Sequence, residues 1–333
     1  MNDSHRKILD IIQSKLPVTE RPWAAVGEQI GLAEDEVMTA VAELREGGVI
    51  RRIGAIFDSF RLGYRTTLCA IAVPEDRVEE VAALISAYPN VTHNYLREDR
   101  YNVWFTLHAP SSERIVEILD EIAQRTGIDD ILNLPATRLF KIRVDFDFTG
   151  DRAARTEAPE IIYPLEIPAA ALSDADKALV RTLQTNLPAG ERPFIEVAEK
   201  IREAGFEVDE AWVIATANRW IDEGVIRRFG AAIKHHRTGY TYNAMGVWNV
   251  PEERLDELGP IMASFKEVSH GYARPSYPTW PHNAYTMIHG TSKAECEDVA
   301  RRIREATGLP EPRLLYSTRE FKKMSMKYFV EGL

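Results

Sequence analysis

The sequence contains two copies of one pattern, and this internal repeat constrains the fold more than any other feature. The clearest match pairs Gly48–Ala55 with Gly224–Ala231, which read GVIRRIGA and GVIRRFGA. Further along the chain, Val91–Tyr95 matches Val268–Tyr272. Two copies of about 150 residues indicate two related domains rather than the short units of a solenoid. A tandem duplication of this kind brings its own pseudo-twofold interface within one chain.

Composition narrows the class of protein. The chain has 333 residues, of which 45% are hydrophobic, enough to bury two ordinary cores. Its formal net charge of -10 argues against non-specific binding to a polyanion. Only Cys69 and Cys296 are present, too few for a disulfide framework or a cysteine-rich metal site. The N-terminus lacks a signal-peptide pattern, and no apolar run reaches the ~20 residues of a membrane span. We therefore expect a cytoplasmic protein with no membrane partner.

The first part of each copy predicts a winged helix-turn-helix domain, at residues 1–62 and 172–238. Three helices follow from apolar residues at helical spacing, from Pro22 in a first turn and from a Gly-Gly stop after the third helix. The run Val49–Phe57 then alternates like a pair of short strands joined by a turn. This order predicts a small domain with the shape of a DNA-binding module.

The charges of the third helix oppose DNA binding. A helix that reads DNA should present basic or amide side chains to phosphates and base edges. Here the helix begins Glu34-Asp35-Glu36, and Arg45 is its only basic residue. The second copy is similarly acidic in this region. We therefore expect a scaffold that keeps the shape of a DNA-binding domain without DNA as a partner.

The second part of each copy predicts a ferredoxin-like βαββαβ domain, at residues 63–148 and 239–333. The last strand of the first unit is predicted as one element over Ile131–Arg143. Residues 149–171 are rich in Ala, Pro and Glu and indicate a linker. The predicted fold class is α+β, a tandem duplication of winged helix-turn-helix plus ferredoxin-like domains. We expect the two sheets to pair within the chain into one pseudo-symmetric body.

The central hairpin of each predicted sheet carries the same polar triplet, His-x-Tyr-x-Arg, at 93–97 and at 270–274. Residues two apart share one face of a strand, so imidazole, phenol and guanidinium line one face. An open alternative is the polar outer face of an antiparallel sheet. His108 and His289, at strand ends, fit a structural role.

The second hairpin is longer by 4 residues, and prolines stiffen the extra segment around Tyr277 and Trp280. This composition fits either a rigid aromatic lid over a flat ligand or a packed surface loop.

A winged helix followed by a ferredoxin-like sheet is the layout of the Lrp/AsnC regulators. Within that superfamily the chain closely resembles the siroheme decarboxylases along nearly its whole length. The specific segments are Thr92–Arg97, Tyr101–Thr106, Ser269–Pro275 and Trp280–Thr286. The two subunits of this family are often separate chains, and here they look fused. The resemblance implies conversion of siroheme to 12,18-didecarboxysiroheme by loss of two acetate carboxyls as CO₂.

Siroheme is a flat iron tetrapyrrole rimmed with carboxylates, so its site needs cations, flat faces and a proton donor. Histidine acid/base catalysis is assigned to His93, His270 and His282. Either His93 or His270 is expected to meet the iron of the substrate, and no cofactor beyond the substrate is expected. The candidate substrate-binding residues are Arg51, Arg52, Tyr95, Arg97, Arg227, Arg228, Lys234, Tyr272, Arg274 and Trp280.

Two other functions stay open on the sequence alone. One is an Lrp/AsnC-type transcription regulator with an effector site in the sheet domain. The other is a heme-binding sensor or carrier, which would share its site with the decarboxylase. The sequence also leaves open whether the chain forms a homodimer and whether it contacts other enzymes of heme biosynthesis.

Overall fold

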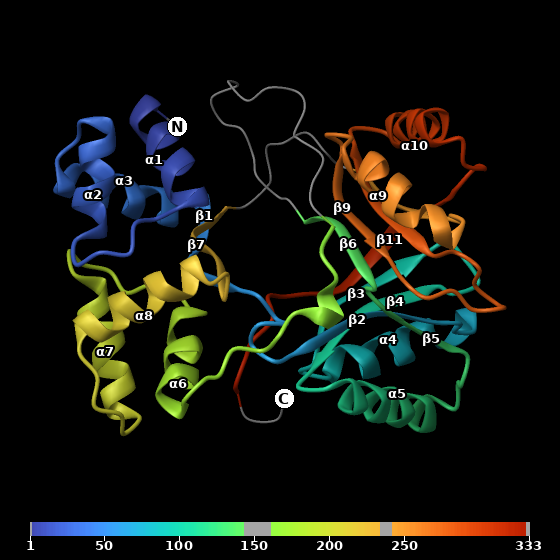
Figure 1. Ribbon diagram of the computed structural model, residues 1–333, viewed down its shortest axis with the longest axis horizontal. Helices are drawn as coiled ribbons and strands as arrows, with labels where there is room; N and C mark the ends of the chain where they lie inside the picture. The colour runs from blue at the N-terminus through green and yellow to red at the C-terminus, as the bar shows by residue number, and fades with distance from the viewer. Residues whose placement is uncertain (1, 143–160, 234–241, 331–333) are drawn as a thin grey trace.

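The computed structural model describes residues 2–142, 161–233 and 242–330, arranged as a helical part and a sheet part side by side (Figure 1). The six helices of the two helix-turn-helix copies gather in one part, and nearly all strands gather in the other. The candidate residue Lys234 lies outside the described residues.

The two copies contribute matching elements in the same order. The helices of the helical part are α1 (Asp3–Ser14), α2 (Pro22–Ile30), α3 (Glu34–Glu46), α6 (Asp174–Leu183), α7 (Pro193–Glu203) and α8 (Glu210–Asp222). Those of the sheet part are α4 (Val78–Ala87), α5 (Ser112–Thr126), α9 (Leu255–Ala263) and α10 (Lys293–Thr307). The strands are β1 (Ile50–Phe57), β2 (Arg65–Ile71), β3 (Val91–Arg97), β4 (Val103–Ala109), β5 (Ile131–Pro135), β6 (Arg138–Ile142), β7 (Ile226–Ile233), β8 (Tyr242–Trp248), β9 (Val268–Ala273), β10 (Ala284–Gly290) and β11 (Arg313–Lys323).

The wing differs from the sequence prediction. The run 49–57 was expected to form two short strands and a turn, and that prediction is wrong because it forms the single strand β1. Its partner is β7, the same segment of the other copy, with Gly54 opposite Gly230 in an antiparallel register. A hairpin and a single strand that pairs with the other copy show the same hydrophobic alternation. The sequence therefore could not distinguish the two structures.

Gly54 and Gly230 allow the first helix of the opposite copy to lie against the wing. A β-carbon at Gly54 would lie 2.5 Å from the carbonyl oxygen of Thr185, just after α6. One at Gly230 would collide with the carbonyl oxygen of Ile12 in α1. The two helix-turn-helix copies are therefore packed into one hydrophobic core by exchange of contacts across the wing.

The remaining nine strands form one antiparallel sheet in the order β5-β2-β4-β3-β11-β8-β10-β9-β6. The strand β11 joins the copies, because its first half pairs with β8 and its second half pairs with β3. On the other side, β5 pairs with β2 of its own copy and β6 pairs with β9 of the second copy. The predicted pairing of the two sheets within one chain is confirmed.

The single strand predicted over Ile131–Arg143 is wrong, since it is interrupted at Ala136 and Thr137 between β5 and β6. The interruption follows from the pairing, because β5 pairs with a strand of the first copy and β6 pairs with a strand of the second. The first and last strands of the sheet are thus consecutive in the chain, and the sheet curls round on itself.

The curled sheet has two kinds of face. The helices α4, α5, α9 and α10 cover its outer face through two separate apolar clusters, one for each copy. Its inner face carries a third cluster, drawn from both copies, that includes Trp104, Trp280 and Tyr285. On this face, residues of one copy therefore pack against residues of the other.

Candidate active site

The two predicted triplets form matched columns on β3 and β9. The ring centres of His93 and Tyr95 are 6.2 Å apart, with an angle of 27° between the ring planes. Those of His270 and Tyr272 are also 6.2 Å apart, with an angle of 15°. Arg97 stands over the Tyr95 ring at 5.8 Å, and Arg274 over the Tyr272 ring at 4.7 Å. We call the first column, with its neighbours Glu320 and Lys323, the first-copy site. The second column, with its neighbours Ser269 and His289, is the second-copy site.

The fold brings the two histidine ends together. Burial first, and then positive charge on His289, His93 and Lys141, lower the pKa of His270 to about 4. Burial likewise lowers the pKa of His108 to about 4, with contributions from Lys322 and His93. One charge lowers the pKa of another group most strongly when the two lie near each other. Histidines from both copies thus gather in one region.

The first-copy site is polar and open on one side. Burial lowers the pKa of His93, as does the nearby charge of Lys323, while Glu320 opposes the shift. The Nδ1 atom of His93 lies 3.0 Å from the hydroxyl of Thr92. The phenol of Tyr95 donates a hydrogen bond to Glu320 at 3.2 Å, and burial raises its pKa. Both Glu320 and Lys323 come from β11, which belongs to the other copy.

The second-copy site is built from partly buried residues. The hydroxyl of Ser269 lies 2.7 Å from Nδ1 of His270 and 2.7 Å from Nε2 of His289. In the strand register, Leu139 of β6 stands opposite Tyr272, at the place that Glu320 takes opposite Tyr95. Burial raises the pKa of Tyr272, and the nearby guanidinium groups of Arg274 and Arg227 oppose that rise.

Arg97, which is buried, and Arg274, which is partly buried, bridge the copies. Arg97 donates to the carbonyl oxygen of Leu315 on β11 at 2.6 Å, and Arg274 donates to that of Leu134 on β5. Among the described residues neither has a carboxylate partner, and burial lowers the pKa of both, that of Arg97 to about 10. A buried guanidinium without an acid is well suited to an anion, since each Nε atom still lacks a partner in the described part of the chain.

His282 and Trp280 lie away from the histidine cluster. At the rise per residue of a β-strand, His93 and Arg97 are about 13 Å apart along β3. His282 lies at the end of the columns that carries the arginines. Its ring lies 4.8 Å from Trp280, and its pKa is lowered by burial and by Arg313. Trp280 is only 1% exposed and packs against Trp104 at 5.4 Å. The packed-loop alternative therefore describes this segment better than a lid.

The wing arginines divide into two kinds. Arg52 donates to the carbonyl oxygen of Gln184 at 2.6 Å, and Arg228 to that of Gln13 at 2.8 Å, so both close the end of a helix. Arg227 forms an ion pair with Asp58 at 2.7 Å, and its charge opposes the rise in the pKa of Tyr272. Arg51 is exposed on β1. Among the predicted wing cations that the structure describes, Arg227 is the one whose charge affects a residue of either column.

Comparison with known proteins decides between the open functions. The chain is 36% identical to a siroheme decarboxylase of Hydrogenobacter thermophilus over 99% of this chain and 96% of that protein. A siroheme decarboxylase alpha subunit of Nitratidesulfovibrio vulgaris is 54% identical over 44% of this chain and 82% of its own length. Two family models also match, the "AsnC-like ligand binding domain" at residues 61–141 and 237–322 and the "Siroheme decarboxylase NirDL-like HTH domain" at residues 5–51 and 176–227.

The chain belongs to the siroheme decarboxylase family. The crystal structure of the siroheme decarboxylase NirDL in complex with an iron-uroporphyrin III analogue superposes with a TM-score of 0.77 at 33% identity, covering 99% of this chain and 96% of that one. The predicted fold class, a duplicated winged helix and ferredoxin-like unit, is confirmed. Family membership makes the chain a decarboxylating enzyme and removes the transcription regulator from consideration.

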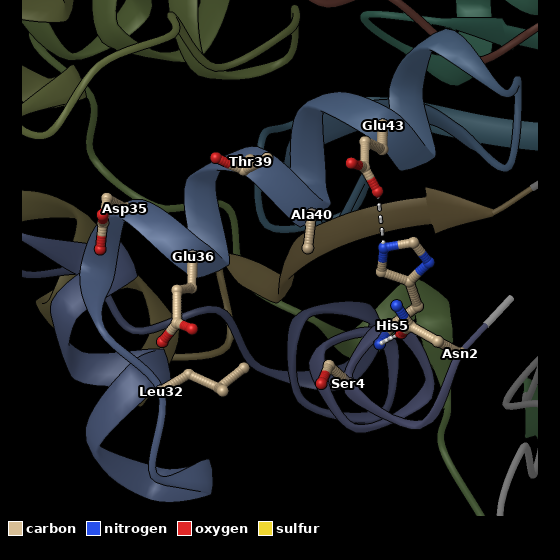
Figure 2. Close-up of a pocket in the computed structure, with 9 residues that line it drawn as sticks. All are labelled: Asn2, Ser4, His5, Leu32, Asp35, Glu36, Thr39, Ala40 and Glu43. Carbon is tan, nitrogen blue, oxygen red and sulfur yellow. Dashed lines mark hydrogen bonds and ion pairs between the residues drawn. The ribbon is translucent and has the colours of Figure 1, made fainter.

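The described residues also form surface hollows away from the two columns. The larger, about 310 Å³, lies between α1 and α3 and is lined by acidic residues among others (Figure 2). In it His5 pairs with Glu43 at 3.0 Å, and Asp35 and Glu36 also line the hollow. The smaller, about 170 Å³, is lined by residues such as Lys293 and Tyr316. An acidic hollow repels a ligand rimmed with carboxylates, so the larger one is a poor siroheme site.

Two further properties concern the described residues only. They include no group of three or more His, Cys, Asp and Glu side chains placed to hold a metal ion. Nor does any helix of this part have the length and apolar character that crossing a bilayer requires.

Sequence reasoning missed the residues that the neighbouring copy supplies. Glu320 and Lys323 are brought to the first-copy site by β11, from a position 225 or more residues away. Ser269 was part of the recognised segment, but its contact with His289 depends on the pairing of β9 and β10. The sequence feature that could have indicated these contacts is the hydroxyl residue that precedes each histidine, Thr92 in one copy and Ser269 in the other.

Proposed function

We propose that this chain removes two acetate carboxyls of siroheme as CO₂ and forms 12,18-didecarboxysiroheme. The observation that carries the proposal is the pair of His-Tyr-Arg columns, which face one region from both copies. The crystallised relative, bound to an iron-uroporphyrin III analogue, supports an iron tetrapyrrole as the ligand. No other cofactor is proposed, because each step consumes a carboxylate and a proton and yields CO₂ and a methyl group, without net oxidation.

The chemistry needs a proton donor at a defined carbon. Cleavage of the bond to the carboxyl carbon leaves an electron pair on the methylene carbon, which the conjugated macrocycle delocalises. A proton must then reach that carbon, and imidazole is the common donor near neutral pH. His270 suits this step, because it is partly buried and lies on a hydrogen-bonded chain. That assignment leaves His93 for the iron contact predicted from the sequence.

The remaining groups of the columns would hold the substrate. Arg97 and Arg274 are proposed to bind carboxylates that are retained, since charge-assisted contacts of a buried guanidinium are strong and directional. Tyr95 and Tyr272 offer flat faces beside the histidines. Arg227 would add a cation from the wing, next to Tyr272. Arg52, Arg228 and Trp280 have structural contacts that account for them, and His282 lies too far along the hairpin to be assigned to this step.

The test is anaerobic incubation of the purified chain with siroheme, followed by mass analysis of the extracted tetrapyrrole. Loss of two CO₂ per macrocycle is the expected result. A matched reaction with the double variant His93→Ala, His270→Ala checks that the proposed site is responsible. His5→Ala, in the acidic hollow, serves as a folded control. Tight binding of siroheme with no change of mass would contradict the proposed reaction.

A further inference from the structure

The second-copy site contains a hydrogen-bonded chain of three side chains. Ser269 stands between two imidazoles, with its Oγ atom 2.7 Å from Nδ1 of His270 and 2.7 Å from Nε2 of His289. A serine hydroxyl has one hydrogen, so it donates to one ring and accepts from the other. Two arrangements follow. In one, Nε2 of His270 carries a hydrogen, and in the other that nitrogen is bare.

We propose that Ser269 and His289 form a proton relay that supplies His270 during decarboxylation. This inference rests on the proposed function, and it adds the route by which the proton arrives. His270 would donate the hydrogen on Nε2 to the substrate carbon. Ser269 and His289 would deliver a new hydrogen to Nδ1, the other nitrogen of the His270 ring. His270 would then stay uncharged throughout.

The transfer balances as a set of concerted shifts. The bond from the substrate carbon to its carboxyl breaks, and CO₂ leaves. The electron pair left on carbon takes the hydrogen from Nε2 of His270. Nδ1 of His270 takes the hydroxyl hydrogen of Ser269, and Ser269 takes the hydrogen from Nε2 of His289. The ring of His289, which is half-buried, regains a proton from water. The net change is one proton moved from solvent to carbon.

Burial explains why a relay is useful here. The pKa of His270 is lowered to about 4, chiefly by burial, so near neutral pH the imidazole is uncharged. An uncharged imidazole is a weak proton source unless its other nitrogen is reprotonated as it gives up the first hydrogen. The chain through Ser269 provides that second transfer and keeps the charge away from the buried ring.

The first copy supplies an internal comparison. Thr92 takes the place of Ser269 and lies 3.0 Å from Nδ1 of His93. The histidine corresponding to His289 is His108, which is 1% exposed, and its Nε2 has no partner among the described residues. The hydroxyl contact is therefore kept in both copies, but it continues to a second histidine only behind His270.

The experiment measures single-turnover decarboxylation and siroheme affinity for Ser269→Ala, Ser269→Thr, His289→Asn and His108→Asn. We expect Ser269→Ala and His289→Asn to slow the reaction about 10- to 100-fold, within the range of general acid catalysis, with affinity changed less than threefold. Ser269→Thr keeps the hydroxyl and should recover most of the rate. His108→Asn is the matched variant in the first copy, where no chain exists, and should slow the reaction less than threefold.

A proton inventory in mixtures of H₂O and D₂O separates a relay from a merely structural contact. A curved inventory for the natural chain that becomes linear in Ser269→Ala supports transfer of several protons together. Equal rate losses for His289→Asn and His108→Asn, or a curved inventory that Ser269→Ala leaves unchanged, would overturn the relay. Failure of the proposed function itself looks different, because the natural chain would then release no CO₂ from siroheme, or His270→Ala would be fully active.

Discussion

The first-copy and second-copy sites have the same three side chains in the same order, yet their surroundings have diverged. Beside Tyr95 stands Glu320, and beside Tyr272 stands Leu139. One histidine has an exposed lysine as neighbour, while the other has a serine and a second histidine. A duplicated chain can therefore keep the fold of both copies and still place charge in one site and a hydrogen-bonded chain in the other. Siroheme is itself asymmetric, and unequal sites are what such a ligand requires.

The largest expected effect distinguishes the two histidines. His270→Ala should lower the rate of single-turnover decarboxylation about 10²–10⁴-fold, the usual contribution of a general acid. His93→Ala should mainly weaken substrate binding and shift the absorption spectrum of the bound iron tetrapyrrole. Stopped-flow absorbance with siroheme measures both quantities. Equal rate losses without a spectral change in either variant would mean that the two histidines share one role.

The next effect concerns the arginines of the two columns. Arg97→Lys and Arg274→Lys should each weaken siroheme binding about 10- to 100-fold, because a charge-assisted hydrogen bond contributes roughly 1.5–3 kcal/mol and lysine cannot reproduce the fork. A binding titration measures the loss. Arg52→Lys, at a helix end of the wing, is the control and should leave affinity nearly unchanged. If Arg97 and Arg274 only hold strands together, thermal stability will fall and affinity will not.

The wing can be tested from either copy. Gly54→Ala and Gly230→Ala should each destabilise the chain by about 1–3 kcal/mol, since the added methyl group meets a helix end with no room to move. Urea unfolding followed by circular dichroism gives the change. Gly31→Ala tests a different effect, because its added methyl group meets open space and its cost comes from the left-handed backbone. A tolerated Gly54→Ala would show that the wing pairing is looser than described.

Stability should also depend on pH through the buried histidines. The pKa of His270 and of His108 is about 4 in the folded chain and about 6.5 when unfolded. The unfolded state therefore binds protons first, and stability is lost as pH falls from about 6.5 to 4, by on the order of 3 kcal/mol for each group. His108→Asn and His270→Asn should each flatten this slope. Unfolding midpoints between pH 4 and 7 would show it, and an unchanged slope would contradict the buried, uncharged state.

The smallest expected effect is on DNA. The helix α3 begins with Glu34, Asp35 and Glu36, and α8 begins with Glu210, so neither copy should bind DNA at physiological salt. A gel-shift assay with mixed-sequence duplexes tests this. Neutralising Glu34, Asp35 and Glu36 together should raise non-specific affinity slightly, and decarboxylation should be unaffected. Sequence-specific binding tighter than about micromolar would show that the domain still reads DNA.

Much of the architecture could be predicted because it depends on local patterns. Helical spacing, glycine stops and strand alternation act over a few residues, and they indicated both domain types. The polar triplets were also visible, because alternation alone puts His93, Tyr95 and Arg97 on one face. The β1–β7 pair, the break between β5 and β6 and the burial of Trp280 were not visible, since each depends on which distant strand becomes the neighbour.

The sequence by itself determined that this chain is a duplicated α+β protein with two histidine-bearing hairpins and acidic third helices. Only the tertiary structure decided that the copies exchange strands, so that β11 brings Glu320 and Lys323 to one histidine while β6 brings Leu139 to the other site. The physical reason is register. Side-chain alternation fixes which face a residue takes, but strand partners far apart in the chain are selected by the packing of the whole sheet.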